Sequence, residues 1–345
     1  MTNEQDQARQ RPHGGNATSD PRLLPSGTRV AVTGGAGFIG SRVVARLLRL
    51  GSRVQVIDDL SIGRVAQLRE AFRLGLSESD IRVVDVRSKN CAAAILEWRP
   101  AVVVHLAAQA SLPVALRSPL MDADINIRGS VNVLEACTRA DVGLVVFAAS
   151  AAIYGQVPPE HLPVTEQTPI VPCSPYGLSK ATALRYLDLF ERHRNLPYVA
   201  LAIGNAYGPR QIGANCGVIP RIASEVVRGM PPSITGDGQQ TRDFVHVTDV
   251  AEAVVKACTG RGRGLINISS GQEASIAEVF DTVCQLADAR ITPTFVPAMP
   301  GDARRMVMDI TRARRALGWQ PMVPLTDGIA EVVRNAQTPR AELAV

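Results

Sequence analysis

Three glycines at three-residue spacing, Gly34, Gly37 and Gly40, follow an apolar run and precede an amphipathic stretch over residues 41–50. A strand, a glycine turn and a helix in this order are typical of dinucleotide-binding folds, although the same triad also occurs in ordinary turns. The first glycine permits the turn, the second lets the backbone approach a pyrophosphate, and the third lets helix and strand pack closely. We therefore expect a cofactor at Gly34, Gly37, Phe38, Ile39 and Gly40.

Acidic residues close the next apolar run, where Asp58 and Asp59 follow Val54–Ile57. A carboxylate there accepts hydrogen bonds from the adenosine ribose and repels a 2′-phosphate, so it favours NAD over NADP, while Arg64 downstream would weaken that preference. Two later strand ends are expected to contact the same cofactor through Asp85, Val86, Leu106, Ala107, Ala108 and Gln109. We interpret the neighbouring His105 as a packed strand-end histidine.

Short apolar runs alternate with amphipathic stretches from Arg29 onward, which predicts strands at 30–32, 54–57, 83–84, 102–104, 145–147 and 199–203. Continuous apolar strands separated by helices indicate a parallel sheet buried on both faces. The predicted fold is therefore α/β, a Rossmann-type doubly wound parallel sheet with a smaller C-terminal substrate-binding lobe.

The chain is expected to divide into three regions. Residues 1–26 have only five apolar side chains, too few to offset the entropy of ordering, so they are predicted to be a disordered tail. Residues 27–204 are expected to form the NAD-binding Rossmann domain. Residues 205–338, which are richer in glycine and proline loops, are expected to form mainly the substrate-binding lobe, interleaved with strands that return to the main sheet.

Charge and apolar patterning argue against several kinds of partner. Thirty-seven Lys and Arg against 32 Asp and Glu give a net charge of +5, without the dense basic clusters typical of a nucleic-acid surface. The longest apolar runs are too short to span a bilayer, so no membrane association is expected.

The cysteines lie far apart and in no metal-binding motif, so neither a metal nor zinc in particular is expected. Scattered thiols, together with an N-terminus that has no apolar secretory segment, favour a cytoplasmic location. The six cysteines are Cys91, Cys137, Cys173, Cys216, Cys258 and Cys284.

A tyrosine and a lysine, Tyr176 and Lys180, are four residues apart in a predicted helix, so both side chains emerge on one face. A nearby ammonium and an oxidised nicotinamide would lower the tyrosine pKa and make it a general base for a hydroxyl proton. Ser150, at a predicted strand end, is placed to hydrogen-bond the reacting oxygen. The alternatives are a surface helix with an ordinary Tyr and Lys, and a serine that merely caps the strand.

Taken together, these motifs resemble those of the extended short-chain dehydrogenase/reductases, and within them the nucleotide-sugar 4-epimerases. The resemblance covers residues 28–336. The motifs are Gly34–Gly40, Asp58-Asp-Leu-Ser, His105-Leu-Ala-Ala-Gln-Ala, Asn126 in Asn-Ile-Arg-Gly-Ser-Val-Asn-Val, Ser150, Tyr176-Gly-Leu-Ser-Lys180, Asn205-Ala-Tyr-Gly-Pro-Arg and Gln240-Thr-Arg-Asp-Phe-Val-His-Val.

The resemblance implies an NAD-dependent isomerase, usually a homodimer, that acts on a nucleotide-diphosphate sugar. Ser150, Tyr176 and Lys180 would be catalytic, and Asn126 would belong to the cofactor site with Tyr176 and Lys180. In the substrate site Asn205 would contact the diphosphate, Val218 the uracil and Asp302 the ribose, with Arg242 and Arg304 on the phosphates. Arg242 has an alternative as a surface arginine paired with Asp243 or Asp249.

Departures from the family pattern reduce the number of reaction types to be expected. Sugar 4,6-dehydratases carry acidic residues right after the catalytic Ser or Thr, and the decarboxylases of UDP-glucuronate use a glutamate, but here Ala151 and Ala152 stand there. Met299 replaces an arginine that many relatives have, which suggests a rearranged phosphate site. We therefore expect C4 epimerisation, with UDP-glucose and UDP-galactose as the substrates.

Three alternatives stay open. The first is a 4-ketoreductase of a nucleotide-diphosphate sugar. The second is an epimerase of UDP-glucuronate, a UDP-N-acetylhexosamine or a dTDP-deoxysugar. The third is a non-catalytic NAD-binding regulator, against which the complete Ser150, Tyr176 and Lys180 set argues.

Overall fold

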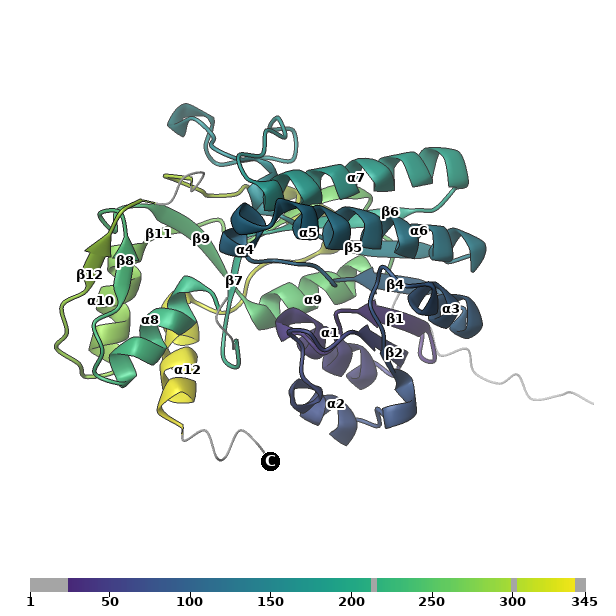
Figure 1. Cartoon of the computed structure of the whole chain (residues 1–345), viewed down its shortest axis with the longest axis horizontal. Coiled ribbons are helices and arrows are strands. Elements are labelled where there is room, and N and C mark those ends of the chain that lie inside the picture. Colours follow the sequence, from purple (N-terminus) through teal and green to yellow (C-terminus); the bar gives the residue numbers. More distant parts are fainter. Residues whose placement is uncertain (1–23, 212–215, 299–302, 339–345) are drawn as a thin grey trace, which may run out of the picture.

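The computed structural model describes residues 24–211, 216–298 and 303–338. Its centre is a seven-stranded sheet in the order β10-β6-β5-β4-β1-β2-β3, with every neighbouring pair parallel (Figure 1). The strands are β1 (Arg29–Thr33), β2 (Arg53–Asp58), β3 (Ile81–Val83), β4 (Val102–His105), β5 (Leu144–Ser150), β6 (Tyr198–Ile203) and β10 (Gly264–Ile268). The strand order reverses between β1 and β4, as in doubly wound folds, so the predicted Rossmann-type fold is confirmed.

Both faces of this sheet are covered, because successive side chains of a strand point to opposite sides. Val30 and Val32 of β1 join one apolar core, and Ala31 joins the other. The first core lies under α1 (Phe38–Arg49), α2 (Arg69–Arg73), α9 (Val247–Ala257) and α11 (Thr311–Leu317), and the second under α3 (Lys89–Trp98), α6 (Gly129–Arg139) and α7 (Pro175–Arg194). The carboxyl ends of the strands therefore form one edge between two helical layers.

Two short helices and a wide turn lead into α6. These are α4 (Leu112–Arg117), α5 (Pro119–Ala123) and a π-helical turn at Asp124–Arg128. Helix α5 packs against α7, the helix that carries the predicted catalytic pair. A π-helical turn is rare and is frequent at functional sites.

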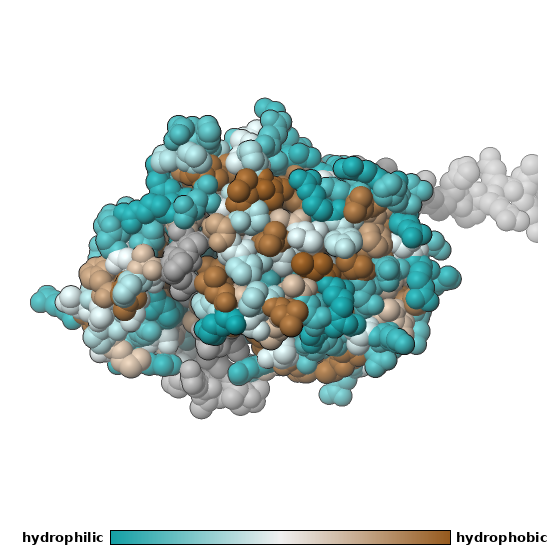
Figure 2. Space-filling view, turned by 45° about the horizontal axis from the view of Figure 1, so that its top comes forward, coloured by the Kyte–Doolittle hydropathy of each residue, from teal (hydrophilic) through white to brown (hydrophobic). Residues whose placement is uncertain are grey.

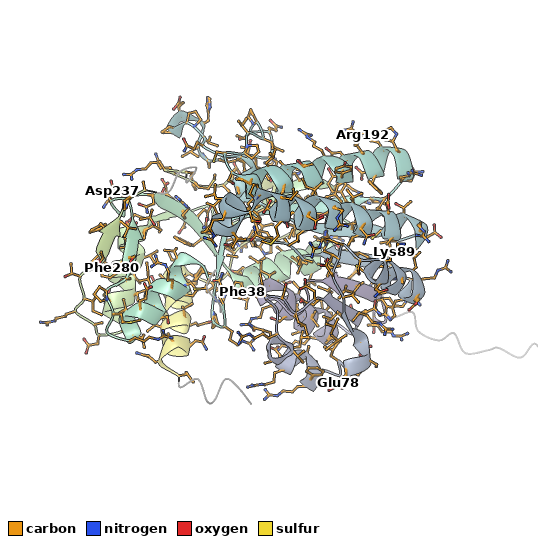
Figure 3. The ribbon with its side chains drawn as sticks, in the orientation of Figure 1. Phe38, Glu78, Lys89, Arg192, Asp237 and Phe280 are labelled. Atoms are coloured by element: carbon orange, nitrogen blue, oxygen red, sulfur yellow. The ribbon has the colours of Figure 1, made fainter. Side chains whose placement is uncertain are left out.

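The C-terminal part of the chain adds a smaller lobe with its own core, at the left of Figure 1. Its sheets are β11-β9-β7 and β12-β8, and its helices surround Phe244 and Phe280. The elements are β7 (Asn205–Tyr207), β8 (Ser233–Thr235), β9 (Thr241–His246), β11 (Glu273–Ser275), β12 (Thr294–Val296), α8 (Val218–Val227), α10 (Ile276–Leu286) and α12 (Leu325–Gln337). Figure 3 shows Phe38 at the end of α1 nearest this lobe, which carries Asp237 and Phe280.

The N-terminal boundary differs from the prediction. Residues 1–23 of the expected tail lie outside the described residues, but Leu24 is only 8% exposed and belongs to the first core. The Thr28 hydroxyl donates to the Pro25 carbonyl, and the Gly27 amide donates to the Gly51 carbonyl. Leu24 is therefore packed against the domain and is not part of a disordered tail, while Pro25 and Ser26 are exposed.

No helix in the described part of the chain is long and apolar enough to cross a membrane.

Candidate active site

The glycine turn between β1 and α1 fits a phosphate group. Gly34 has φ +70°, and a Cβ on it would lie 2.7 Å from the Ala107 nitrogen. A Cβ on Gly40 would lie 2.0 Å from the Gly34 carbonyl oxygen, so only glycine lets the helix start this close to the strand. Gly37 caps α1 without a side-chain hydrogen bond, and no acidic residue lies in the first turn. The helix N-terminus thus keeps amide groups for an anion.

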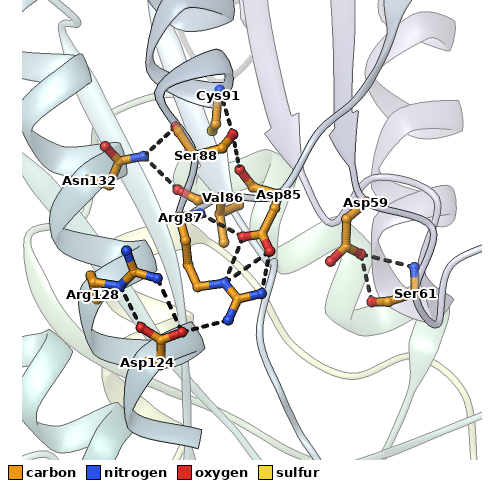
Figure 4. Close-up of polar contacts among 10 residues, drawn as sticks. All are labelled: Asp59, Ser61, Asp85, Val86, Arg87, Ser88, Cys91, Asp124, Arg128 and Asn132. Atoms are coloured by element: carbon orange, nitrogen blue, oxygen red, sulfur yellow. Dashed lines mark hydrogen bonds and ion pairs between the residues drawn. The ribbon is translucent and has the colours of Figure 1, made fainter. Parts of the chain in front are cut away.

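Asp58 and Asp59 play different parts after β2. The Asp58 carboxylate is 6% exposed and accepts hydrogen bonds from the Ala36 and Leu60 amides, both at 2.9 Å, so it ties the glycine turn to β2. Burial raises the pKa of Asp58, and these two bonds oppose the rise. Asp59 is exposed and accepts from the amide and hydroxyl of Ser61 (Figure 4). Asp58 keeps acceptor capacity for a ribose hydroxyl, since a carboxylate offers about four acceptor positions.

Asp85 belongs to an ion-pair network on the same edge (Figure 4). Its carboxylate accepts from the Arg87 amide and guanidinium, and Arg87 also binds Asp124, which in turn binds Arg128. Hydrogen bonds from Arg87 lower the pKa of Asp85, and those from Arg128 and Arg87 lower the pKa of Asp124 to about 2. Arg87 was not predicted, and a cofactor contact by Asp85 would have to share the carboxylate with it.

The segment after β4 lies beside the glycine turn. The Leu106 amide donates to the Thr33 carbonyl and the Ala107 amide to the Thr33 hydroxyl, so these residues and Ala108 line the point where the strand order reverses. His105 is 1% exposed, with its ring nitrogens 2.7 Å from the Thr33 hydroxyl and 2.9 Å from that of Ser130. Burial lowers the His105 pKa to about 3, which agrees with its interpretation as a packed strand-end histidine.

Two predicted cofactor residues are held in a buried network. Gln109 is 5% exposed and Asn126 is 2% exposed. The Gln109 amide nitrogen donates to Asp122 at 2.8 Å and the Asn126 amide nitrogen to the same oxygen at 3.1 Å. Asp122 is absent from the predicted site; its only sequence signal is the spacing of four residues from Asn126, which puts both on one helical face.

Ser150, Tyr176 and Lys180 come together at the carboxyl edge of the sheet. The Ser150 hydroxyl, at the end of β5, lies near the phenol of Tyr176 and favours its ionised form. Ser150 also caps the short turn that follows, accepting from the Ala152 amide at 3.2 Å. Helix α7 starts with Ser174 as its N-cap, and a Cβ on Gly177 would lie 2.4 Å from the Ala152 carbonyl oxygen. This close approach presses the first turn of α7 against the end of β5.

Lys180 is buried beneath this pair, with 3% of its surface exposed. Its Nζ donates to the Ala148 carbonyl at 2.8 Å and lies 4.8 Å from the centre of the Phe147 ring. Burial lowers the Lys180 pKa to about 8, while the charge of Asp122 opposes that fall. Burial also raises the pKa of Tyr176, while Ser150 opposes that rise, so the expected lowering of the tyrosine pKa is not a property of these side chains alone.

The predicted substrate residues lie on the C-terminal lobe. Asn205 is exposed at the start of β7, opposite Phe244 of β9, two residues from Arg242. Arg242 is half-buried and donates to the Thr241 carbonyl at 2.7 Å. Val218, also half-buried, begins α8.

Of the two remaining predicted substrate residues, the structure describes Arg304 but not Asp302. Arg304 binds the exposed Asp237 with both terminal nitrogens, at 2.7 and 3.0 Å, so a substrate phosphate would have to displace that carboxylate. Asp302 and Met299 lie outside the described residues. Asp243, named above only as an alternative partner of Arg242, is fully buried and accepts from the Ser270, Gly271 and Met308 amides, so it fixes the turns beside Arg242.

Among the described residues, no group of three or more His, Cys, Asp or Glu side chains is arranged to hold a metal ion.

Comparison with known proteins places this geometry in a family. The profile described as the NAD dependent epimerase/dehydratase family matches residues 30–269. This chain belongs to the NAD-dependent epimerase/dehydratase family. The predicted family, its NAD dependence and its enzymatic nature are thereby confirmed.

Individual members of the epimerase/dehydratase family are similar over most of the chain. The UDP-glucose 4-epimerase of Mycolicibacterium smegmatis is 38% identical over 308 residues, which cover 88% of this chain and 97% of the relative. A crystal structure of the Thermotoga maritima UDP-glucose 4-epimerase with UDP-glucose aligns with a TM-score of 0.84 at 35% identity, covering 89% and 98% of the two chains. That of the Thermus thermophilus UDP-glucose 4-epimerase with NAD aligns at 0.82 and 37% identity, covering 90% and 99%.

Proposed function

We propose that this protein interconverts UDP-glucose and UDP-galactose by NAD-dependent epimerisation at C4, through a transient 4-keto sugar. The observation that carries the proposal is the convergence of Ser150, Tyr176 and Lys180 at the same carboxyl edge of the sheet as the glycine turn, with Ala151 and Ala152 where an eliminating enzyme needs carboxylates. The similarity of this chain to UDP-glucose 4-epimerases over nearly 90% of its length supports the choice of sugar.

The residues around the glycine turn would hold NAD. Gly34, Gly37, Phe38, Ile39 and Gly40 would receive its pyrophosphate and Asp58 its adenosine ribose, with Asp59, Asp85, Val86, Leu106, Ala107, Ala108, Gln109, Asn126, Tyr176 and Lys180 completing the site. When bound, NAD supplies the acceptor and donor of the C4 hydride. Tyr176 would lose its proton more readily beside the positive charge of the oxidised nicotinamide.

The three catalytic side chains divide the proton chemistry. Tyr176 takes the proton of the C4 hydroxyl through its phenolic oxygen and returns it when the opposite epimer forms. The Ser150 hydroxyl, which lies near that phenol, would orient the reacting oxygen. The Lys180 ammonium, with 3% exposure and an anchor on Ala148, stabilises the phenolate by charge in a poorly solvated site. Ala151 and Ala152, the two residues directly after Ser150, have no acidic group for eliminating water.

The substrate would lie between the sheet edge and the C-terminal lobe. Asn205 and Arg242, on neighbouring strands β7 and β9, would contact the diphosphate, and Val218 of α8 the uracil. Asp302 would contact the ribose, and Arg304 would reach a phosphate after leaving Asp237. We place the boundary between cofactor domain and substrate lobe at residues 204 and 205.

Two further features concern assembly and location. Figure 2 shows hydrophobic residues gathered on the face turned forward from the top of Figure 1, and Leu120 of α5 and Leu178 of α7 are 82% and 57% exposed. We propose that two copies associate as a homodimer through α5 and α7, which would cover these side chains. The buried Cys91, Cys137 and Cys258 are free thiols, which supports a reducing, cytoplasmic location.

A sugar panel tests the proposed substrate. Purified protein is incubated separately with UDP-, dTDP- and GDP-sugars, including UDP-glucuronate and UDP-N-acetylglucosamine, and the products are resolved by chromatography. We expect UDP-glucose and UDP-galactose to interconvert with the highest kcat/KM. Turnover of another sugar alone would reassign the substrate. Reduction of an added nucleotide-linked 4-keto sugar with stoichiometric consumption of NAD(P)H, without interconversion of the C4 epimers, would make the protein a 4-ketoreductase.

A further inference from the structure

A buried carboxylate lies behind the catalytic helix. Asp122, in α5, is 1% exposed, and its Oδ1 accepts hydrogen bonds from the side-chain amides of Gln109 at 2.8 Å and Asn126 at 3.1 Å. Its Oδ2 is buried without a hydrogen-bond partner among the described residues. Burying a carboxylate that is only partly hydrogen-bonded costs free energy, so its presence calls for an explanation other than packing.

The same network reaches the catalytic tyrosine through its backbone. The Asn126 amide nitrogen also donates to the Ser179 hydroxyl at 3.0 Å, and this hydroxyl donates to the Tyr176 carbonyl at 3.0 Å. Helix α5 packs directly on α7. Asp122 is thus fixed relative to Tyr176 and Lys180, and its position does not depend on a mobile surface side chain.

The charge of Asp122 acts on both members of the pair. It opposes the fall that burial imposes on the Lys180 pKa, and it adds to the rise of the Tyr176 pKa. A negative charge favours the protonated form of either group, because it stabilises an ammonium and disfavours a phenolate.

Other titratable groups near the pair are neutral or occupied elsewhere. His105 of β4, which lies close enough to feel the Lys180 charge, has a pKa of about 3. On the elements packed against α5, Arg117 of α4 is exposed, and Asp124 and Arg128 of the π-helical turn bind each other at the surface. Strand β5 presents the Phe147 ring and the Ala148 carbonyl to Lys180.

We propose that Asp122 is a positioning residue whose buried negative charge keeps Lys180 protonated and sets the pH range in which the Tyr176–Lys180 pair works. This role rests on the proposed function, since it presumes that the pair performs the proton transfer. Asp122 acts through Lys180 and Tyr176 and touches no reacting atom in the proposal.

The test is the pH dependence of kcat/KM for Asp122→Asn. Activity that needs a tyrosinate and an ammonium falls on both sides of an optimum. Removing the negative charge lowers the pKa of both groups. The acidic limb of the pH profile, set by Tyr176, and the alkaline limb, set by Lys180, should therefore both move to lower pH, each by about 0.5 unit or more. Asp124→Asn is the matched control, because it removes the same charge two residues away, in a surface ion pair, and should leave both limbs in place.

A second variant separates charge from folding. Asp122→Ala also removes the charge but adds no buried amide donors, so it should shift both limbs in the same direction as Asp122→Asn. A loss of activity with unmoved limbs in either folded variant, or limbs that move apart, would overturn the proposal.

A spectroscopic titration does not depend on turnover. The near-ultraviolet absorbance of Tyr176 is obtained by subtracting a Tyr176→Phe spectrum from that of the parent holoenzyme, with and without Asp122→Asn. The tyrosinate midpoint should fall when Asp122 is replaced, and an unchanged midpoint would overturn the proposal. If Tyr176→Phe retained full activity, the proposed function would fail, while this titration would still decide whether the Asp122 charge reaches Tyr176.

Discussion

The α-carbon of Gly177 lies so close to the carbonyl oxygen of Ala152 that a Cβ at this position would be 2.4 Å from that oxygen. Real Cβ atoms do not approach backbone oxygens this closely, so any larger residue must move the first turn of α7 away from the end of β5. That turn carries Tyr176, and the end of β5 carries Ser150. The contact therefore sets the distance between two catalytic side chains.

Gly177→Ala should lower kcat by about 10–100-fold, since a displacement of about 1 Å at a catalytic group costs about that much. This loss is expected although alanine in a helix interior is more favourable than glycine by about 1 kcal/mol. Steady-state kinetics measure the effect, with Arg185→Ala, an exposed position on the same helix, as the control. A kcat within twofold of the parent would show that the close contact does not position Tyr176.

Lys180→Met should abolish most activity yet stabilise the fold at neutral pH. Lys180 has a pKa of about 8 in the folded chain against 10.5 in the unfolded chain, so the unfolded state binds the proton more tightly. Below about pH 8 the folded protein bears the full cost of the buried ammonium, at most about 3 kcal/mol, and that cost disappears as the pH rises from 8 to 10.5.

The stability gain of Lys180→Met should therefore be largest near pH 7 and shrink toward pH 10, as measured by urea unfolding. Lys89→Met, at an exposed lysine, should show no such trend. A gain that does not change with pH would contradict a low pKa for Lys180.

Arg242→Ala should raise KM about 10–150-fold with a much smaller fall in kcat. A charge-assisted hydrogen bond contributes about 1.5–3 kcal/mol, and a contact to the diphosphate is the same in ground and transition states. Steady-state kinetics on the NAD-loaded enzyme measure KM and kcat, and Arg290→Ala, at an exposed arginine, is the control. A KM within twofold of the parent would show that Arg242 does not bind the diphosphate, and Arg304 would be the next residue to test.

Leu24→Ala should destabilise the fold, whereas removal of residues 1–23 should not. Leu24 is 8% exposed in the first core, and burial of a leucine side chain contributes about 1.5–3 kcal/mol. The truncated segment has too few apolar side chains to bury comparable surface. Thermal unfolding of the two variants separates these cases, and a similar loss in the truncated chain would mean that the segment also packs.

The cofactor half of the fold was predictable because its signals are local. Each buried parallel strand is an apolar run, and the glycine turn requires its residues at fixed spacing, so β1, β2 and the start of α1 follow from the sequence. The short strands β7, β8, β11 and β12 have three residues each and carry no such periodicity. Their pairing depends on the packing of α8, α10 and α12.

The candidate site was predictable only in part, because burial and long-range partners decide the rest. The four-residue spacing predicted that Tyr176 and Lys180 share a helical face, but burial, which raises the tyrosine pKa, depends on the assembled fold. Asp122 reaches Gln109 across 13 residues, and Arg304 binds Asp237 across 67. Neither contact leaves a pattern in the linear sequence.

In the proposed reaction NAD is regenerated at each turnover, and Tyr176 is the base. The most direct measurement is conversion of UDP-galactose to UDP-glucose by purified protein with no NAD added, with the NAD content of the protein determined in parallel. We expect many turnovers per bound NAD, and a 10²–10⁴-fold lower kcat for Tyr176→Phe at equal NAD content, with Tyr186→Phe on the same helix unaffected. Conversion that stops after one equivalent of product per bound NAD, or full activity of Tyr176→Phe, would contradict the proposed reaction.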